Sequence, residues 1–446
     1  MKQTEIGLMP DDWEIVTIGG TFNIQQGKQV SKKNREGNNQ MPFLRTANVF
    51  WDGLDLSVLD KMHFNEKEEE RFQLLENDLL VCEGGDIGRT SICETDLPGI
   101  YYQNHLFRLR PKNDKVEPRY FIYWMNYFVQ HTEYYGSAGN KTTIPNLSQS
   151  RLCSFHFPKP DVSEQQSISH ILTLIQSAIQ KQEQIIRITT ELKNALIQKL
   201  FTEGTKGEAQ KQTEIGLIPE SWEVVELKKT GDVIYGIQAA VANNTNPIGT
   251  KILTNVNISL DGRIDLQKVR YYKLKSKRDF NTILQQGDIL FNWRSGSKEH
   301  VGKTAIFDLE GEYTHSSFIL RIRPNNKVVN HYLYLYLNHL RSTGYFVKQQ
   351  TYSINAKFNK SAIEVLPVVL PEKDEQLIIS NTIKTINNKL EHHQTKKQTL
   401  TALFRSLLHQ LMTGQVRVKD LNIKKRLTLR QSVAESLYKK KTNNAR

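Results

Sequence analysis

The chain has 446 residues, of which 38% are hydrophobic and 24% charged, which allows two or three globular domains and argues against wholesale disorder. Its three cysteines, Cys82, Cys93 and Cys153, form no CxxC pair, which excludes a disulfide scaffold and a thiolate zinc cluster and suits a reducing cytoplasm. There is no signal-peptide pattern at the start and no run of about 18 apolar residues, so we expect a cytoplasmic protein without a membrane span.

The net charge of +13 suggests a polyanionic partner, but this charge is unevenly placed along the chain. Residues 415–446 hold ten basic and two acidic side chains, a net charge of +8, which leaves +5 for the other 414 residues. A nucleic acid bound by the body of the protein would therefore need local basic patches. The tail at 415–446 fits either a flexible phosphate-binding arm or a solvated charged extension.

The first elements of the chain recur in its second half. Residues 2–8, KQTEIGL, return letter for letter at 211–217, and Trp13 returns as Trp222. Later matches drift between offsets of 209 and 214, as expected when loops differ in length. The sequence therefore indicates a tandem duplication of a unit of about 210 residues. We expect both tryptophans to be packing anchors at the start of a domain rather than stacking platforms.

Each unit begins with a part that mixes short strands with a few helices. Apolar runs between Gly, Asn, Asp and Pro turn signals indicate strands, among them 78–82, 106–109, 288–291 and 318–322. Apolar spacing indicates helices at 118–129 and 330–340. We therefore expect two mixed α/β domains, at residues 1–160 and 206–371.

A long helix follows each domain. Residues 163–201 and 372–413 contain neither Gly nor Pro, and we expect helical regions at 161–205 and 372–414. Apolar residues at alternating spacings of four and three predict a coiled-coil seam. The predicted seam consists of Ile168, Leu172, Ile175, Ile179, Ile186, Leu196, Leu200, Ile379, Ile383, Ile386, Leu390, Leu400, Phe404, Leu407 and Leu411.

Both helices carry a polar residue at the same step of the seam, Gln182 in the first and His393 in the second. Such residues either fix register and partner choice or lie at a solvated edge. Because each helix is reached through a bulky domain, we expect the two to pair antiparallel. The predicted fold is α+β: a tandem duplication of a mixed α/β domain followed by a long coiled-coil helix, with a basic tail after residue 414.

The two copies disagree in three pairs of segments. These are 25–35 against 234–247, 83–87 against 292–301, and 136–146 against 348–357. All are polar, turn-rich and either basic or amide-rich, which suits base readout, because Arg pairs bidentately with guanine and Asn or Gln with adenine. The same composition suits plain solvent exposure. The candidate DNA-binding residues are Gln25, Lys28, Lys32, Lys33, Arg35, Asn140, Lys141, Thr142, Asn146, Gln238, Trp293, Arg294, Ser295, Lys298, Gln350, Asn355 and Lys357.

The sequence contains no convincing catalytic motif. Before Gly302-Lys303-Thr304 the glycine that a P-loop needs lies one residue too far back, so we expect a structural turn there. Neither a glycine-rich S-adenosylmethionine loop nor metal-ligand spacing around His392 and His393 occurs. We therefore predict no catalytic residue and no metal in this chain. An autonomous nuclease or methyltransferase with a hidden site, and a pure coiled-coil scaffold, stay open as alternatives.

The duplicated start (TEIGLMPDDWEIV and TEIGLIPESWEVV), the paired helices and the terminal LLHQLMTG at 407–414 together resemble a known family. They are similar to the specificity (S) subunit of type I restriction-modification enzymes, over nearly the whole chain to about residue 425. The resemblance implies that each domain is a target recognition domain for one half of a gapped double-stranded DNA site. It also implies that the helices are conserved regions that set the gap, and that the chain itself is non-catalytic.

The resemblance further implies partners and cofactors outside this chain. Two methylation (M) subunits would dock on the helices, bind S-adenosylmethionine and methylate adenine. Two motor-nuclease (R) subunits, with ATP and magnesium, are possible further partners. The family's recognition domains are its most variable part, so no base-contacting residue follows from the motif, and the candidates above rest on comparison of the two copies.

Overall fold

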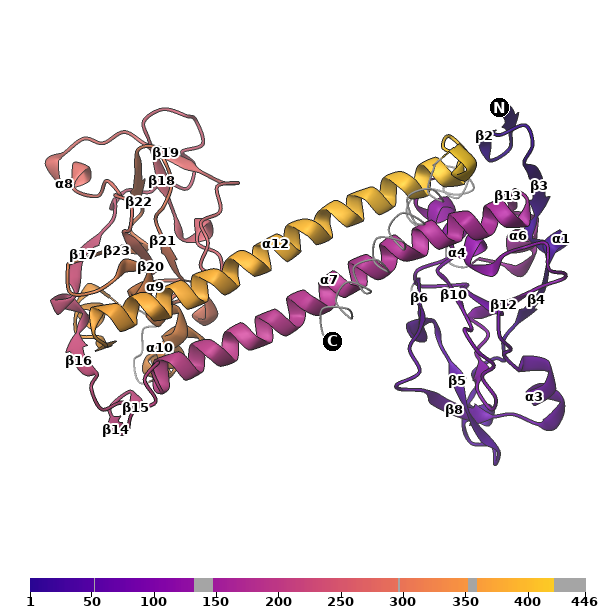
Figure 1. The fold of residues 1–446 in the computed structure, drawn as a ribbon, viewed down its shortest axis with the longest axis horizontal. Coiled ribbons are helices and arrows are strands. Elements are labelled where there is room, and N and C mark those ends of the chain that lie inside the picture. Colours follow the sequence, from indigo (N-terminus) through magenta and orange to yellow (C-terminus); the bar gives the residue numbers. More distant parts are fainter. Residues whose placement is uncertain (52, 132–146, 296, 352–358, 421–446) are drawn as a thin grey trace, which may run out of the picture. The chain divides into compact units, whose positions relative to one another are not determined.

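The computed structural model describes the chain apart from residues 52, 132–146, 296, 352–358 and 421–446. The described part forms two compact units. The first unit contains Met1–Glu183 and the chain from Lys396 onward, and the second contains Gln184–Thr395. Each unit therefore holds one globular domain and one half of each long helix (Figure 1). Over the residues described, no helix combines the length and the apolar character needed to cross a bilayer.

The first unit is built on a four-stranded antiparallel sheet in the order β10-β9-β12-β4 and a three-stranded sheet in the order β11-β5-β8. Three two-stranded pairs, β1–β2, β6–β7 and β3–β13, accompany them. Its strands are β1 (Lys2–Thr4), β2 (Gly7–Met9), β3 (Glu14–Thr17), β4 (Phe22–Gln26), β5 (Gln40–Leu44), β6 (Val49–Phe50), β7 (Gly53–Leu54), β8 (Asp60–His63), β9 (Leu79–Cys82), β10 (Thr90–Ile92), β11 (Tyr101–Tyr102), β12 (Leu106–Pro111) and β13 (His156–Lys159). Its helices besides the long ones are α1 (Ile18–Thr21), α2 (Lys32–Arg35), α3 (Glu66–Phe72), α4 (Pro118–His131), α6 (Gln149–Ser154) and the 3-10 turns η1 (Thr46–Asn48) and η5 (Val418–Asp420).

Strand β9 shows why the predicted apolar runs form the centre of the domain. Its side chains alternate between the two faces of the sheet, and both faces are covered. Leu79 and Val81 join the core beside α4, whereas Leu80 and Cys82 join a second core beside the three-stranded sheet. All four are fully buried, so a strand without polar alternation is the expected sequence at this place.

The second unit repeats the same arrangement. Its four-stranded sheet has the order β21-β20-β23-β17, and its three-stranded sheet has the order β22-β18-β19. Its strands are β14 (Gln210–Thr213), β15 (Gly216–Pro219), β16 (Glu223–Glu226), β17 (Gly231–Tyr235), β18 (Thr250–Leu253), β19 (Arg270–Tyr272), β20 (Ile289–Asn292), β21 (Thr304–Ile306), β22 (Tyr313–His315), β23 (Ile319–Pro324) and β24 (Pro367–Leu370). Its shorter helices are α8 (Lys277–Phe280), α9 (Asn330–Ser342), α10 (Tyr345–Thr351), α11 (Lys360–Glu364) and the 3-10 turns η2 (Leu227–Lys229), η3 (Asn255–Asn257) and η4 (Lys298–His300).

One buried ion pair recurs in both four-stranded sheets. Arg110 donates from Nε and Nη2 to the two carboxylate oxygens of Asp78, each at 2.7 Å, and Arg323 does the same to Asp288. Both aspartates are 1% exposed. A bidentate pair of this kind satisfies a buried carboxylate and fixes the orientation of the arginine. The matching pairs show that the duplicated sequence forms a duplicated framework.

The two long helices are α7 (Val162–Thr202) and α12 (Lys373–Met412). Within the first unit, Glu164 near the start of α7 bonds Arg417 just beyond α12, whereas Glu183 further along α7 pairs with Lys397 of α12. Residue numbers therefore rise along one helix as they fall along the other, which is the antiparallel pairing that the sequence predicted. In the second unit Thr205, just after α7, donates its backbone N–H to Glu375 near the start of α12 at 2.8 Å, in the same sense.

All fifteen predicted seam residues are buried or half-buried. The polar seam residue Gln182 is only 7% exposed, so the solvated-edge alternative does not describe that position. Lys193 occupies a seam step of α7 in the second unit, and burial lowers the pKa of its ammonium group. The seam thus keeps its 3.5-residue period even where the side chain is polar.

Each domain is anchored at its start by a tryptophan. Trp13 is 1% and Trp222 0% exposed, which confirms their predicted role as packing anchors. Each indole Nε1 donates to a glutamate at the start of a long helix, Trp13 to Glu164 and Trp222 to Glu375, at 3.2 Å in both cases. A buried indole N–H needs such an acceptor, and this one also joins the domain to its helix.

The residues after α12 return to the first unit. Gly414 has φ +63°, and a Cβ atom there would lie 2.2 Å from Pro10 Cγ, so only glycine fits this approach. Val416 and Val418 then pack against the core of the first unit. The sequence predicts a basic tail from residue 415 onward, whereas the structure places Gln415–Asp420 on the domain.

Candidate nucleic-acid interface

Two of the three pairs of segments in which the copies differ, 25–35 with 234–247 and 83–87 with 292–301, begin at one edge of the four-stranded sheet. In the first unit, β4 ends at Gln26, β9 ends at Cys82 and β12 begins at Leu106. The strand register pairs Leu106 with Cys82, and the next residue, Phe107, with Gln26. Because neighbouring strands in this sheet are antiparallel, all the loops that follow or precede these ends leave the sheet on the same side. We call this side the loop edge.

Backbone hydrogen bonds tie these loops to one another in the first unit. Glu83, the first residue after β9, donates its N–H to the carbonyl of His105 at 2.9 Å. Leu147, which follows the segment 132–146, donates its N–H to the carbonyl of Glu83 at 2.9 Å. Three regions far apart in the sequence therefore meet at the loop edge.

The second unit has an equivalent loop edge. Strand β20 ends at Asn292, which pairs with Ile319 at the start of β23. The following residue, Trp293, donates its N–H to the carbonyl of Phe318 at 3.3 Å. Lys360, just after the segment 352–358, donates its N–H to Tyr235 Oη at 3.0 Å. The same three regions therefore meet here as in the first unit.

At each loop edge the strand is followed by a glycine, Gly27 or Gly236, that lies too close to the neighbouring backbone for a side chain to fit. A Cβ atom at Gly27 would lie 2.3 Å from the carbonyl oxygen of Gln103, and one at Gly236 would lie 2.2 Å from that of His315. The strand before each glycine can therefore pass directly over the turn between the neighbouring strands. This close approach fixes where the following loop starts in both units.

The structure places the candidate residues as follows. Lys32, Lys33, Arg35, Gln238 and Arg294 are exposed. Gln25, Trp293 and Ser295 are half-buried, and Lys28 is buried. Asn140, Lys141, Thr142, Asn146, Asn355 and Lys357 lie outside the described residues, as do the side chains of Lys298 and Gln350. The described candidates stand on or next to the loop edges, and their contacts with DNA stay predictions.

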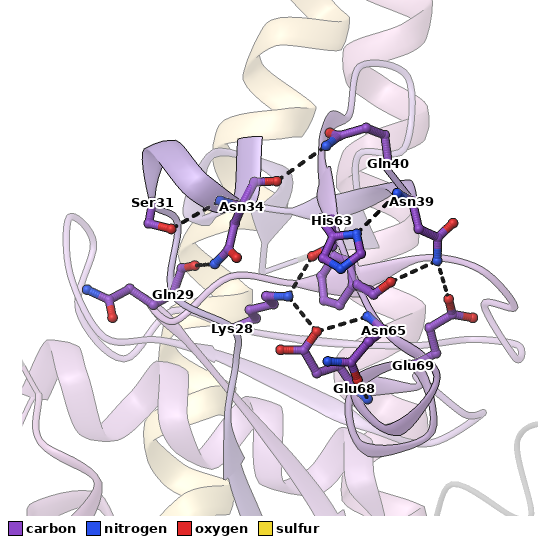
Figure 2. A network of polar contacts seen from close by, with 11 residues as sticks. Lys28, Gln29, Ser31, Asn34, Asn39, Gln40, His63, Asn65, Glu68 and Glu69 are labelled. Atoms are coloured by element: carbon purple, nitrogen blue, oxygen red, sulfur yellow. Dashed lines mark hydrogen bonds and ion pairs between the residues drawn. The ribbon is translucent and has the colours of Figure 1, made fainter. Parts of the chain in front are cut away.

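Lys28 uses its charge within the first unit. The side chain is 8% exposed, and Nζ donates to the carbonyl oxygen of His63 at 2.6 Å and to Glu68 Oε2 at 2.5 Å. Figure 2 shows Lys28 directed between these two residues, in a polar network that also includes Asn39 and Glu69. In the second unit the apolar Ile237 occupies the position of Lys28. The N–H of Lys28 donates to the carbonyl of Tyr102 at the end of β11, and the N–H of Ile237 donates to the carbonyl of His315 at the end of the equivalent strand β22. Lys28 therefore holds the loop in position.

Arg294 is exposed at the second loop edge and is supported from below by an aromatic ring. Its guanidinium lies over the ring of Phe318, 5.4 Å from the centroid, and Phe318 is itself 39% exposed. The adjacent Trp293 donates from Nε1 to the carbonyl oxygen of Ser317 at 2.7 Å and packs edge-on against Tyr235. An aromatic ring beneath the guanidinium restricts its motion while leaving its N–H groups free to pair outward.

The first unit carries a different pair at the same position. Glu83 takes the place of Trp293, and His105 takes the place of Phe318. His105 Nδ1 and Glu83 Oε2 are 3.2 Å apart, and the histidine side chain is 50% exposed. The sequence comparison missed His105 and Phe318 because they lie next to well-matched strand residues. The signal was available, since the two copies differ in residue type there.

A buried histidine lies behind the second loop edge. His315 is 0% exposed, and Nδ1 is 3.2 Å from the carbonyl oxygen of Ile319. Burial lowers the pKa of His315 to about 3, so its imidazole is neutral near pH 7. The equivalent residue in the first unit is Tyr102, which occupies the same step of the parallel pairing. His315 shapes this edge but brings no positive charge to it.

The predicted structural turn is confirmed at Gly302-Lys303-Thr304. Lys303 is 5% exposed, and Nζ donates to the carbonyl oxygens of Asn255 and Ile258 at 2.9 and 2.5 Å. An ammonium group held by two carbonyls inside the domain cannot bind a phosphate. In the first unit Arg89 makes the equivalent contact to the carbonyl of Thr46 at 2.7 Å. Within the described ranges, no group of three or more His, Cys, Asp or Glu side chains is placed to hold a metal ion.

Comparison with known proteins identifies a matching family model. The model described as the type I restriction modification DNA specificity domain matches residues 10–193 and again residues 219–402. A protein of Methanocaldococcus jannaschii provisionally named the type I restriction enzyme MjaX specificity subunit is 25% identical over 426 residues, covering 94% of this chain and 97% of that protein. The type I restriction enzyme MjaVIII specificity subunit of the same organism is 24% identical, covering 93% of this chain and 95% of its own length.

Solved structures agree in fold. The S subunit of a type I restriction-modification system from M. genitalium superposes with a TM-score of 0.56 at 14% identity, covering 92% of this chain and 98% of that one. A chain from a structure describing complex assembly and conformational transition of a type I R-M system gives a TM-score of 0.55, also at 14% identity, covering 92% and 99%. At this identity the likeness concerns the fold alone.

Proposed function

The chain belongs to the family of type I restriction-modification DNA specificity domains, which it carries twice, and we propose that each domain reads one half of a gapped, bipartite DNA site. It is a specificity subunit with tandem recognition domains. The proposal extends this to directed adenine methylation and restriction, performed by partner subunits. In that scheme S-adenosylmethionine, ATP and magnesium belong to the partners.

One observation carries the proposal. The two units share strand order, core ion pairs and tryptophan anchors, yet they differ where their loops meet at the loop edge. At equivalent positions the first unit presents Glu83 and His105, whereas the second presents Trp293, Arg294 and Phe318. Arginine suits guanine and carboxylates suit the amino groups of cytosine or adenine, so the two edges suit unlike half-sites. A scaffold without sequence preference would not need this difference.

The long helices support the second part of the proposal, in which their length sets the gap between half-sites. Helices α7 and α12 have 41 and 40 residues and a seam that is buried or half-buried along its length, so each is a stiff element of defined length. A helix rises about 1.5 Å per residue, and adjacent base pairs are about 3.4 Å apart. Changes in helix length would therefore change the gap in small, countable steps.

Helix α7 also supports docking of methylation subunits. Outside its buried seam, the second-unit half of α7 exposes Ile185, Ile188 and Leu192, by 37%, 51% and 59%. Their spacings of three and four residues place them on one face of the helix. An exposed apolar stripe of this kind is typical of a protein-binding surface.

A methylome tests the main proposal. The chain would be expressed with its neighbouring methylation subunit in a host without adenine methylation, and modified adenines would be mapped at single-base resolution. We expect a gapped motif with two unlike halves. Absence of modification, with both proteins folded and associated, would overturn the proposal.

The docking surface has its own test. Ile188→Glu combined with Leu192→Glu should abolish co-purification with the methylation subunit, whereas Thr190→Glu, on an exposed position of the same helix, should not. Equal association of both variants would show that the stripe is not the docking surface. Circular dichroism would verify that the helix is intact in each.

A further inference from the structure

In each unit two segments lie side by side next to the loop edge. We call residues 28–40 of the first unit and 237–250 of the second the loop segments, because they follow the glycine at the loop edge. We call residues 60–71 and 268–279 the hairpin segments, because they contain β8 with α3, and β19 with α8.

The two segments are joined directly in both units. In the first, Figure 2 shows Asn39 and Gln40 of the loop segment beside His63 of the hairpin segment, and Asn39 N–H donates to His63 Nδ1 at 3.1 Å. In the second, the N–H of Tyr271 donates to the carbonyl of Asn244 at 2.9 Å. The pair of segments therefore forms one continuous surface in each unit.

The charges on this surface are exchanged between the units. In the first unit the loop segment carries Lys28, Lys32, Lys33 and Arg35 against one acid, and the hairpin segment carries five acids against three bases. In the second unit the loop segment has no charged residue, and the hairpin segment carries six bases against one acid. At the paired strand position Asp60 of β8 corresponds to Arg270 of β19. Each unit is thus basic on one segment only: the loop segment in the first unit and the hairpin segment in the second.

Many of the cations on the basic segments are exposed. Lys268, Lys273, Lys275, Lys277 and Arg278 are exposed in the second unit, and among the described residues no ion pair holds any of them. The three cationic side chains of α2 in the first unit are likewise exposed.

The acids of the first hairpin segment are largely engaged within the protein. Glu68 pairs with Lys28, and Asp60 pairs with Arg45 at 2.6 Å. Glu69 accepts from Tyr101 Oη at 3.1 Å.

Surface hollows connect the second hairpin segment to the loop edge. One hollow is lined by Gly236 and Gln238 at the loop edge together with Tyr272 and Arg278. A neighbouring hollow shares Tyr272 and adds Tyr271, Lys273 and Lys275, opposite the asparagines of the loop segment. Concave surface lined by lysine, arginine and aromatic rings, continuous with exposed amides, suits a nucleic-acid backbone and the sugars attached to it.

We infer that the two units hold the DNA backbone with opposite segments: the second through Lys273, Lys275 and Arg278 of its hairpin segment, the first through Lys32, Lys33 and Arg35 of its loop segment. This inference rests on the proposed function. The phosphate contacts position each domain on the duplex, and the side chains at the loop edge are then free to discriminate bases. Lys28 and the first hairpin segment serve to hold the loop rather than to bind DNA.

Salt dependence tests the inference, because each phosphate contact contributes about 0.9 to the slope of log affinity against log salt. The full chain would be titrated on a duplex of random sequence between about 50 and 200 mM salt. Lys273→Gln with Lys275→Gln should lower the slope by about 2, and Lys32→Gln with Lys33→Gln should do the same. The two effects should add in the quadruple variant.

A matched control removes equal charge from the opposite segment. Lys61→Gln with Lys67→Gln alters two exposed lysines of the first hairpin segment and should leave the slope unchanged. An equal loss of slope in this control, or an unchanged slope in Lys273→Gln with Lys275→Gln, would overturn the inference. Failure of the wild-type chain to bind any duplex would instead overturn the proposed function. All substituted side chains are exposed, and matching melting curves would verify the fold.

Discussion

Arg417 donates from Nε and Nη2 to the two carboxylate oxygens of Glu164, at 2.7 and 2.6 Å, and so ties the chain beyond α12 to the start of α7. The same guanidinium bonds both oxygens of Asp12 at 2.8 Å and lies over the Trp13 ring. The bond to Arg417 lowers the pKa of the Asp12 carboxyl to about 2. A residue that follows α12 and residues near the start of the chain therefore close the first unit together.

Replacing this arginine should destabilise the first unit. Arg417→Ala would leave the carboxylate of Glu164, whose side chain is only 8% exposed, without its cation. Loss of one partner from a buried ion pair is costly, and with Arg417 itself 14% exposed we expect a loss of about 2 to 4 kcal/mol. Amide hydrogen exchange would show faster opening of strands β9 and β12, with β20 and β23 unchanged at first.

The control for this prediction is Lys419→Ala, which removes an exposed cation two residues away. It should leave the exchange rates unchanged. If Arg417→Ala also left them unchanged, the residues after α12 would not be part of the first unit's stability. An equal effect on both units would mean that the arginine acts through the helices rather than through its own domain.

The second unit should lose stability in mild acid because of His315. Burial lowers the folded pKa of His315 to about 3, below its ordinary value of 6.5. Between these two pH values the unfolded chain therefore binds a proton at His315 that the folded chain does not bind. The contribution of neutral His315 to the free energy of unfolding is complete above pH 6.5. It is lost as the pH falls from 6.5 towards 3, by up to about 1.4 kcal/mol per pH unit. His339, whose pKa burial lowers to about 4, adds to the same trend.

His315→Asn isolates this contribution. Asparagine keeps a donor near the carbonyl of Ile319 but does not titrate, so the variant should be less stable at pH 7 and show a shallower pH dependence. Urea unfolding measured between pH 7 and 5, with exchange of β20 and β23 as the probe, gives both quantities. A pH dependence as steep as that of the wild type would assign the effect to other groups.

The sequence predicted those features that rest on local patterns. The duplicated start located Trp13 and Trp222, and the spacing of Ile168, Leu172 and their successors gave the buried seam, because helical periodicity is a property of neighbouring residues. Contacts between distant residues could not be obtained in this way. Lys28 is held by Glu68, 40 residues along the chain, and Arg417 by Glu164, 253 residues away.

In the candidate site, too, local patterns were predictable and contacts between distant residues were not. The segments at 25–35, 83–87 and 292–301 were identified because the two copies disagree there. That 25–35 and 83–87 start at one edge of the first unit depends on the strand order β10-β9-β12-β4, and 292–301 starts at the equivalent edge of the second unit, where the order is β21-β20-β23-β17. A single sequence does not encode such an order locally. Phe318 was missed because it lies next to the well-matched residues of β23, and its contact with Arg294 could not be foreseen because it depends on the pairing of β20 with β23.

Arg294 should determine specificity in one half-site only. Arg294→Ala removes an exposed guanidinium held over Phe318, and a bidentate contact to guanine is worth about 1 to 3 kcal/mol of discrimination. Methylome mapping of the variant should show relaxed preference at one position of one half, with the other half and the gap unchanged. Lys275→Gln serves as control and should weaken all sites alike. A uniform loss in Arg294→Ala would make it a phosphate contact instead.

Helix length should set the gap. A seven-residue insertion keeps the heptad of the seam, so one heptad would be added to α7 after Gln182 and one to α12 after Lys397, at the level where Glu183 and Lys397 pair. The insertions lengthen both helices by about 10 Å, which corresponds to about three base pairs. We expect a methylated motif with the same two halves and a gap about three base pairs longer. A four-residue insertion in α7 alone breaks the seam and serves as the contrast, since it should cost activity at every gap. An unchanged gap in an active double-insertion variant would show that the helices do not set it.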